Sequence, residues 1–332
     1  MQSPLNYHGM ALAVIACAVL LCAAAAPAAP ADPCPRGDLD PRFCDRNGDL
    51  LADPPADPKS FVDPPTLIFA YTPVEDPAVY REVWKEFLAH LEKATGRRVQ
   101  FFPIQSNAAQ IEAMRAGRLH VGGFNTGSVP FAVNAAGFVP FAVMARADGT
   151  TGYEMEILVS RDSPIRTVEA LRGKTIAFTA PTSNSGYKAP TLLLKESNGF
   201  VEGRDYKTAF SGKHDNSILG VLHHDYDAAA VANSVLRQMI RRGVVKEEDF
   251  RTIYRSEPFP TTAYGVAHDL EPALARKIRD AFFSFSWEGS GLMREFGGSE
   301  GVRFVPVRYK DAWAAIRRID AASGVNYGTG KP

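Results

Sequence analysis

Four consecutive polar side chains, from Thr182 to Ser185, stand between a strand-like segment and a helix-like segment. The preceding residues read "KTIAF" and the following ones "TLLLKESNGF". A helix start needs one capping side chain, and Ser183 or Ser185 could supply it. The free N–H groups and the dipole of a helix start also attract anions, and Gly186 would let a ligand approach the backbone. The surplus of polar groups therefore predicts an oxyanion site, with simple capping as the alternative.

From Thr66 onward, strand-like and helix-like segments alternate along the chain. The run "TLIFAYTP" predicts a strand, and the helix after it opens with Asp76 as cap and Pro77 at its first position. Further strands and helices follow in turn, and we find no internal repeat. This alternation predicts an α/β fold with largely parallel sheets, whose ligands bind at the carboxyl ends of the strands.

Composition excludes one class of partner. The chain has 332 residues, 45% apolar and 22% charged, and its 37 basic residues balance its 37 acidic ones. These values are typical of a soluble protein with one large or two medium domains. Nucleic-acid binders usually carry a basic stripe, so we expect no nucleic-acid partner. A small anion needs only local donors and stays compatible with zero net charge.

The first residues predict export. The apolar run of residues 10–26 is followed by "PAAPAD", which predicts a signal peptide over residues 1–31 and a periplasmic location. The segment before the run has no Lys or Arg, which a signal peptide usually has. An uncleaved membrane anchor is the alternative, although the run is shorter than a usual membrane span.

Residues 32–65 form a Pro- and Asp-rich segment, here called the collar, with too few apolar residues for a core. Its two cysteines, Cys34 and Cys44, predict a disulfide in an exported protein. The collar stretch "DRNGDLLAD" also resembles the short calcium loops of thrombospondin type 3 repeats. Oxygen side chains at its positions 1, 3, 5 and 9 predict a structural Ca²⁺ site, with a merely solvated acidic loop as the alternative. These side chains are Asp45, Asn47, Asp49 and Asp53.

Several segments together, in this order and spacing, resemble one family. They include "AMRAGRLHVGGFN", "GYEMEILVSRDSPI", "PTSNSGYKAP" and "GKHDNSILGVLHHDYDAAAVA". The chain from Thr66 to about Ile319 is similar to the substrate-binding component of phosphate, phosphite and phosphonate ABC importers, a branch of the type 2 periplasmic binding proteins. The resemblance implies a binding protein without catalysis or a required cofactor. It also implies a small oxyanion ligand, an ABC permease as partner, and a monomer.

The resemblance implies two lobes, each a mixed, mostly parallel sheet flanked by helices, joined by two hinge strands. We expect lobe one over residues 65–153 plus 262–332, and lobe two over residues 154–261.

The resemblance also assigns roles to individual residues. Ser183, Asn184 and Ser185 match the family turn that grips phosphoryl oxygens, and His214 matches a histidine that contacts the same group. Tyr153, at the expected hinge, matches a tyrosine that reaches the ligand. The alternatives are a buried or surface histidine and an aromatic side chain that only packs. Polar residues at strand ends and helix starts are expected as weaker contacts: Tyr71, Asn107, Asn125, Thr126 and Thr182.

Ser234 and Thr262 stand where aminoalkylphosphonate binders of the family carry two carboxylates. Neither side chain can balance an ammonium group. We therefore expect a ligand without an amino group: phosphate, phosphite, or a simple or esterified phosphonate.

Two other functions compete with transport. A periplasmic sensor that presents the same ligand to a receptor kinase would have a similar sequence. A secreted phosphoester hydrolase is the alternative from the enzyme class, because "GGSEG" (residues 297–301) matches the G-x-S-x-G nucleophile elbow. That elbow needs a strand before it and a helix after it, whereas the flanking segments predict the reverse. No histidine follows His268, so the usual order of a catalytic triad is also missing.

Overall fold

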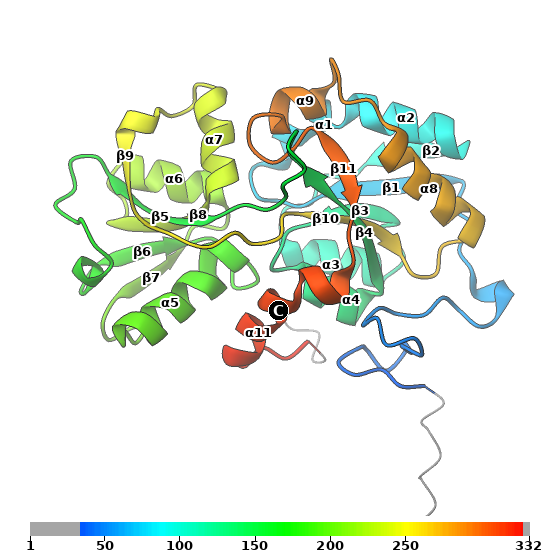
Figure 1. Cartoon of the computed structure of the whole chain (residues 1–332), viewed down its shortest axis with the longest axis horizontal. Coiled ribbons are helices and arrows are strands. Elements are labelled where there is room, and N and C mark those ends of the chain that lie inside the picture. Colours follow the sequence, from blue (N-terminus) through cyan, green and yellow to red (C-terminus); the bar gives the residue numbers. More distant parts are fainter. Residues whose placement is uncertain (1–33, 328–332) are drawn as a thin grey trace, which may run out of the picture. The chain divides into compact units, whose positions relative to one another are not determined.

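The computed structural model describes residues 34–327, so the predicted signal peptide lies outside the described part. Within this part, no helix is long and apolar enough to cross a bilayer. Residues 66–322 form two lobes, each a mixed β-sheet covered by helices (Figure 1). The predicted two-lobed α/β fold is therefore confirmed.

The first lobe is built on a six-stranded sheet with the order β11-β4-β10-β3-β1-β2. Its core is rich in aromatic side chains: Trp84 and Phe87 pack on Phe69 of β1, and Phe282 packs on Phe87. The strands are β1 (Thr66–Tyr71), β2 (Arg98–Phe101), β3 (Val121–Phe124), β4 (Phe138–Ala145), β10 (Ala263–Ala267) and β11 (Arg303–Pro306). The helices are α1 (Pro77–Val83), α2 (Lys85–Thr95), α3 (Asn107–Arg115), α4 (Val129–Ala136), α8 (Pro272–Ser284), α9 (Gly291–Phe296), α10 (Tyr309–Ala312) and α11 (Ala314–Ala322).

The second lobe is built on a five-stranded sheet with the order β7-β6-β8-β5-β9. Its strands are β5 (Met155–Ser160), β6 (Thr175–Phe178), β7 (Lys207–Phe210), β8 (Ala228–Ala232) and β9 (Phe250–Arg255). Its helices are α5 (Ala189–Asn198), α6 (His214–Leu222) and α7 (Asn233–Arg241), and a π-helical turn, Asn184–Lys188, leads into α5. Short 3₁₀ helices span Glu169–Leu171 and Glu247–Asp249 in this lobe, and a third, Pro58–Ser60, lies in the collar.

Parallel pairing is less dominant in both sheets than the sequence predicts. Of the nine strand pairings in these sheets, four are parallel: β1 with β2 and β3, and β6 with β7 and β8. The strands on either side of the two segments that connect the lobes are β4, β5, β9 and β10, and they pair antiparallel. A segment that leaves one lobe and a segment that returns to it run in opposite directions, so they add antiparallel strands to each sheet.

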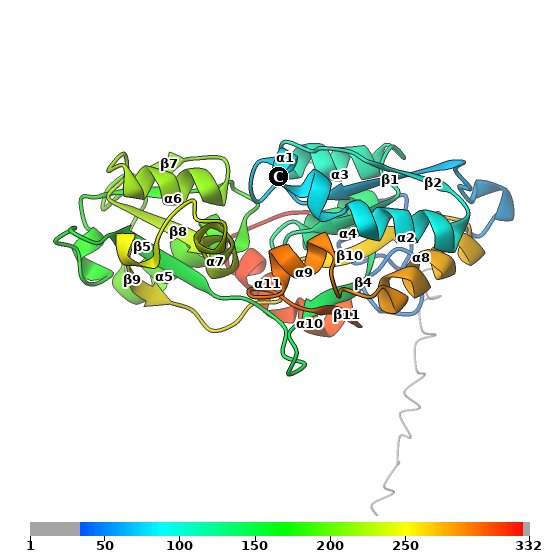
Figure 2. The same cartoon turned by 90° about the horizontal axis from the view of Figure 1, so that it is seen from above.

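Two chain segments connect the lobes, and they pair with each other. One runs from β4 to β5 and the other from β9 to β10, and both are seen between the lobes in Figure 2. Tyr153 and Phe259 form an antiparallel bridge in which each backbone N–H donates to the other residue's carbonyl, at 3.0 and 2.8 Å. The hinge is therefore a short two-stranded ribbon, with the Tyr153 side chain buried at its centre.

The collar contains the predicted disulfide between Cys34 and Cys44. The expected calcium site stays a prediction: among residues 34–327, no group of three or more His, Cys, Asp or Glu is placed to hold a metal ion. The loop oxygens accept hydrogen bonds instead. Asp45 accepts from the backbone N–H groups of Asp49 and Leu50, both at 3.0 Å, and Asp53 pairs with Arg46 at 3.0 Å. The alternating oxygens therefore stabilise a tight turn through hydrogen bonds to backbone N–H groups.

Candidate ligand-binding site

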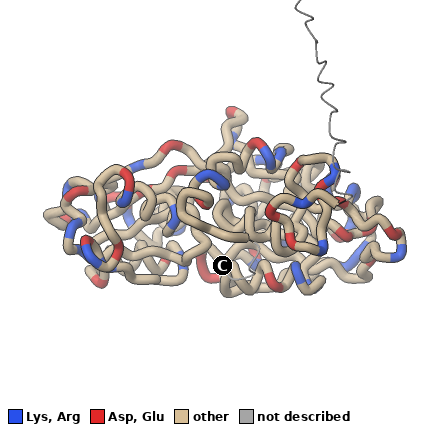
Figure 3. The backbone as a smooth tube through the Cα atoms, turned by 90° about the horizontal axis from the view of Figure 1, so that it is seen from below, with Lys and Arg blue, Asp and Glu red and all other residues tan. Residues whose placement is uncertain are grey.

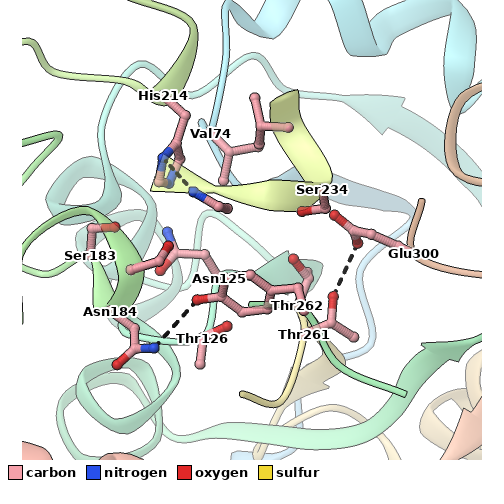
Figure 4. Close-up of a pocket in the computed structure, with 14 residues that line it drawn as sticks. Val74, Asn125, Thr126, Ser183, Asn184, His214, Ser234, Thr261, Thr262 and Glu300 are labelled. Atoms are coloured by element: carbon pink, nitrogen blue, oxygen red, sulfur yellow. Dashed lines mark hydrogen bonds between the residues drawn. The ribbon is translucent and has the colours of Figure 1, made fainter. Parts of the chain in front are cut away.

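A small cavity lies between the two lobes and the hinge (Figure 4). About 30 Å³ of it is open to the centre of a water-sized sphere, which is room for only a few water-sized groups. Nine of the twelve predicted contact residues line this cavity, while Tyr71, Asn107 and Thr182 do not. The lining residues are Val74, Asn125, Thr126, Tyr153, Ser183, Asn184, Ser185, His214, Ala232, Ser234, Val235, Thr261, Thr262 and Glu300.

The polar run after β6 forms the start of the π-helical turn. The Ser183 hydroxyl oxygen accepts from the Gly186 backbone N–H at 3.0 Å, so Ser183 is the cap. The amides of Asn184 and Ser185 occupy the first two positions of the turn, where a helix leaves its N–H groups without internal partners. Ser183 therefore caps the turn, and the neighbouring polar residues Asn184 and Ser185 line the cavity without serving as caps.

Gly186 has another role than the expected one. A Cβ atom at this position would lie 2.0 Å from the Thr179 hydroxyl and 2.7 Å from the Ser183 hydroxyl. The glycine is required by close packing inside the turn, and Gly186 is not among the cavity-lining residues.

Tyr153 reaches the same turn from the hinge. Its phenol oxygen accepts a hydrogen bond from the Asn184 amide at 3.4 Å and also interacts with Ser185 and Thr126. Burial raises the pKa of Tyr153, and these hydrogen bonds offset part of the rise. The phenol therefore stays protonated at neutral pH and keeps its donor.

His214 begins helix α6 and lines the cavity from the second lobe. The Ala232 backbone N–H donates to His214 Nδ1 at 3.2 Å, so in the neutral ring the proton sits on Nε2. Burial lowers the pKa of His214 to about 4. Near neutral pH, His214 is therefore a neutral donor through Nε2, which the sequence left open.

Asn107 and Thr182 connect the lobes beside the cavity instead of lining it. The Asn107 amide donates to the Thr182 hydroxyl at 2.8 Å across the lobes, and its oxygen accepts from Asn125 at 2.8 Å. Asn125 also accepts from the backbone N–H and the hydroxyl of Ser128, at the start of α4. These amides fix the cavity wall and are occupied by protein partners.

Tyr71 belongs to the aromatic core of the first lobe. Its ring lies 4.5 Å from that of Tyr80 and 5.3 Å from that of Trp84. Its hydroxyl interacts with Thr262, which does line the cavity. Tyr71 can therefore act on a ligand only through Thr262.

The wall opposite the turn contains a carboxyl group, Glu300. The Thr261 hydroxyl donates to Glu300 Oε2 at 3.0 Å (Figure 4), and Ser234 also hydrogen-bonds to this carboxyl group. Burial raises the pKa of Glu300, and the two hydroxyl groups offset part of the rise. Glu300 was not among the predicted contact residues, although it lines the cavity beside Ser234 and Thr262.

Sequence reasoning missed Glu300 because it lies in "GGSEG", a stretch read only as a hydrolase motif. Helix α9 precedes this stretch and strand β11 follows it, the reverse of a nucleophile elbow, as predicted. A Cβ atom on Gly301 would lie 2.7 Å from the backbone of Ala145, so the stretch packs tightly against the end of β4. The sequence signal for this contact was an acidic residue, Glu300, followed directly by a glycine, Gly301, that allows close packing.

The cavity has hydrogen-bond donors, but no Lys or Arg side chain is among the described residues that line it. The ionisable side chains among these residues are Tyr153, His214 and Glu300. Such a site binds an anion through neutral hydrogen-bond donors and backbone amides, not through ion pairs.

Comparison with known proteins identifies the family. The sequence model of the protein family described as "ABC transporter, phosphonate, periplasmic substrate-binding protein" matches residues 69–312. The chain belongs to this family. The phosphate-import protein PhnD of Mycolicibacterium smegmatis is 27% identical over 272 residues, which cover 78% of this chain and 83% of that protein. The phosphonates-binding periplasmic protein of Escherichia coli is 24% identical, covering 78% of this chain and 80% of that protein.

Solved structures of the family share the fold. A binding protein component of an ABC phosphonate transporter from Pseudomonas aeruginosa aligns with a TM-score of 0.71 at 20% identity, over 79% of this chain and 87% of that chain. PhnD1 of Prochlorococcus marinus, in complex with methylphosphonate, aligns with a TM-score of 0.66 at 17% identity, over 79% of this chain and 99% of that chain.

Proposed function

We propose that this protein captures a phosphorus oxyanion in the cavity between its lobes and delivers it to an ABC permease. One observation carries the proposal: the start of the π-helical turn, the neutral His214 ring and the Tyr153 phenol all line one small cavity, and no Lys or Arg is among the described residues that line it. Several neutral donors around a small space suit a tetrahedral anion. The relatives include a phosphate-import protein and a binding protein in complex with methylphosphonate, and they support the same class of ligand.

The proposed contacts divide by role. The amides and side chains of Ser183, Asn184 and Ser185 hold the anion oxygens, and His214 and Tyr153 each donate one hydrogen bond. Asn125, Thr126, Ser234 and Thr262 line the remaining wall. The space suits phosphate, phosphite or a small phosphonate, and no cofactor takes part.

The test is calorimetry with phosphate, phosphite and methylphosphonate on the wild type and on Ser185→Ala. We expect the wild type to bind at least one of these ligands, and Ser185→Ala to bind it about 1–3 kcal/mol more weakly, because a buried ligand oxygen loses its partner. Ser197→Ala is the matched control, since Ser197 is exposed near the other end of α5. Unchanged affinity in Ser185→Ala would exclude this turn as the binding site.

The wider role includes a periplasmic location, a monomeric protein and no nucleic-acid partner. Lys and Arg are interspersed with Asp and Glu along both lobes (Figure 3), which suits a protein that meets a small ligand and a membrane permease. A sensor that passes the ligand signal to a receptor kinase would use the same cavity. Pull-down with the ABC permease in the presence of ligand separates these two roles.

We also infer that the protein has no hydrolase activity. Ser299, the serine of the G-x-S-x-G match, accepts from Gln238 at 3.2 Å and is buried between a helix and a strand. Turnover of a chromogenic phosphoester that is lost on Ser185→Ala or Ser299→Ala would contradict this inference.

A further inference from the structure

Glu300 presents a buried carboxyl group to a cavity proposed to hold an anion. Its side chain is buried, with the residue 5% exposed, and it interacts with the hydroxyl groups of Thr261 and Ser234. Both neighbours are neutral, so neither balances a negative charge. A carboxylate and an oxyanion in a space of this size would repel each other strongly.

The charged groups around Glu300 do not remove this conflict. Arg146 has only a weak effect on Glu300, and its guanidinium donates to the Gly152 carbonyl at 2.6 Å. Glu295 adds a second negative charge nearby, but it pairs with Arg242 at 3.1 Å. The remaining neighbours are protonated phenols: Tyr71, Tyr153 and Tyr264.

We propose that Glu300 and the bound ligand share one proton, which makes Glu300 a specificity residue for oxyanions that can carry a proton. In the complex, either a P–O–H group donates to the Glu300 carboxylate, or the protonated carboxyl group donates to a ligand oxygen. In both arrangements the shared proton forms a hydrogen bond between Glu300 and the ligand. The pair then carries one negative charge fewer than an ionised Glu300 facing a fully deprotonated ligand. This inference rests on the proposed function and names the protonation state of its ligand.

The inference separates two anions of similar size and shape. Phosphate, phosphite and methylphosphonate take up or release a proton near neutral pH, as phosphate esters do with a pKa of about 6. Sulfate is fully deprotonated there and has no proton to share. It could bind only if Glu300 supplied the proton, so the site is expected to reject it. Binding of sulfate would leave the buried Glu300 carboxylate without a hydrogen-bond donor from the ligand, and an unpaired buried polar group of this kind is a strong source of selectivity.

The first experiment measures the binding of phosphate, methylphosphonate and sulfate by calorimetry to the wild type and to Glu300→Gln. Glutamine keeps the shape, loses the charge and supplies an amide donor. We expect the preference of the wild type for methylphosphonate over sulfate to shrink by about tenfold or more in Glu300→Gln, mainly through tighter sulfate binding. Glu288→Gln, at an exposed site between α8 and α9, is the control that should keep the wild-type preference.

Two results would overturn the inference. One is an unchanged preference in Glu300→Gln. The other is a wild type that binds 2-aminoethylphosphonate far more tightly than methylphosphonate and loses this preference in Glu300→Gln, because Glu300 would then hold an ammonium group. If the wild type binds none of the phosphorus oxyanions, the proposed function itself fails, so the two failures are distinguishable.

A second experiment uses the wild type alone and stays informative if Glu300→Gln does not fold. When Glu300 and the free ligand are both ionised, forming the shared hydrogen bond takes up about one proton, so the uptake should rise towards one as the pH is raised. Calorimetry of methylphosphonate binding in buffers of different ionisation enthalpy measures this uptake. We expect a value near one; binding without proton uptake would overturn the inference.

Discussion

At the residue scale, the site depends on how burial sets the protonation of each group. Burial lowers the pKa of His214 and raises those of Tyr153 and Glu300. All three shifts favour the neutral form, because a charged form loses its hydration inside the protein. His214 and Tyr153 are therefore neutral donors near pH 7, and in the proposed complex backbone amides and hydroxyl groups also contact the ligand.

The pKa of His214 predicts a loss of stability in acid. The ring has a pKa of about 4 in the folded protein, against about 6.5 in an unfolded chain. Between these values the unfolded state binds more protons, so the free energy of unfolding falls as the pH drops from about 6.5 to about 4. The contribution of His214 to this fall is about 2–3 kcal/mol.

The measurement is denaturant unfolding of the ligand-free wild type and His214→Gln at about pH 7.5 and about pH 4.5. The variant should lose about 2–3 kcal/mol less than the wild type between these two conditions. The pKa values of His120 and His268 are also lowered by burial, but both residues are present in both proteins and cancel in the comparison. Equal losses would show that His214 is not the buried neutral ring described here.

At the element scale, the turn after β3 and the turn after β6 meet across the lobes at Gly127. A Cβ atom on Gly127 would lie 2.1 Å from the Thr182 carbonyl oxygen and 2.5 Å from the Asn184 nitrogen. Gly127 belongs to the first lobe and the other two residues to the second. The backbone at Gly127 is not left-handed, so alanine fits the first lobe by itself. The glycine is needed only when the lobes approach.

Gly127→Ala should therefore weaken ligand binding without unfolding the protein. The added methyl group keeps the two turns apart, so the cavity cannot close around an anion and affinity should fall by about tenfold or more. Calorimetry with methylphosphonate measures the loss, and thermal melting of the ligand-free protein is the control for folding. Small-angle scattering should show a larger radius of gyration than the wild type in the presence of ligand. Wild-type affinity in Gly127→Ala would contradict this view of closure.

At the scale of the whole described molecule, buried ion pairs hold the lobes together on both sides of the cavity. Lys188, at the end of the π-helical turn, lies 2.5 Å from Asp320 of α11 and donates to the Gly127 carbonyl at 3.1 Å. Asp320 also accepts from Tyr327 at 2.7 Å. On the other side, Arg242 pairs with both Glu75 and Glu295. These contacts stabilise the approach of the lobes seen in this structure.

Removing the acidic partner of Lys188 should be costly, because it leaves a buried charge without a counter-ion. The Lys188 and Asp320 side chains are 3% and 1% exposed, and burial already lowers the pKa of Lys188. Asp320→Asn should reduce the free energy of unfolding by about 3–5 kcal/mol, measured by denaturant titration.

Two further variants test the cause. The double variant Lys188→Met with Asp320→Leu should recover most of the loss, since it removes both charges. Asp311→Asn, which breaks the exposed pair with Arg308, should cost about 1 kcal/mol or less. A double variant as unstable as Asp320→Asn would point to packing of α11, not to the unpaired charge.

The sequence by itself determined the parts of this protein that depend on local patterns. Alternating strands and helices predicted the α/β class, and two cysteines in a short exported segment predicted the disulfide. The cap at Ser183 and the position of His214 at a helix start also follow from neighbouring residues. Ser183 and His214 then meet because parallel strands bring their carboxyl ends to one edge of a sheet.

Only the tertiary structure decided which distant residues join them. Glu300 reaches the cavity from a glycine-rich stretch that packs against β4, and Gly127 matters only where two turns from different lobes touch. Lys188 and Asp320 pair across 132 residues of sequence. The collar loop shows the opposite limit: its spacing suits a cation, yet its oxygens bind backbone N–H groups. Such contacts depend on burial and on the approach of separate segments, which residue order alone does not specify.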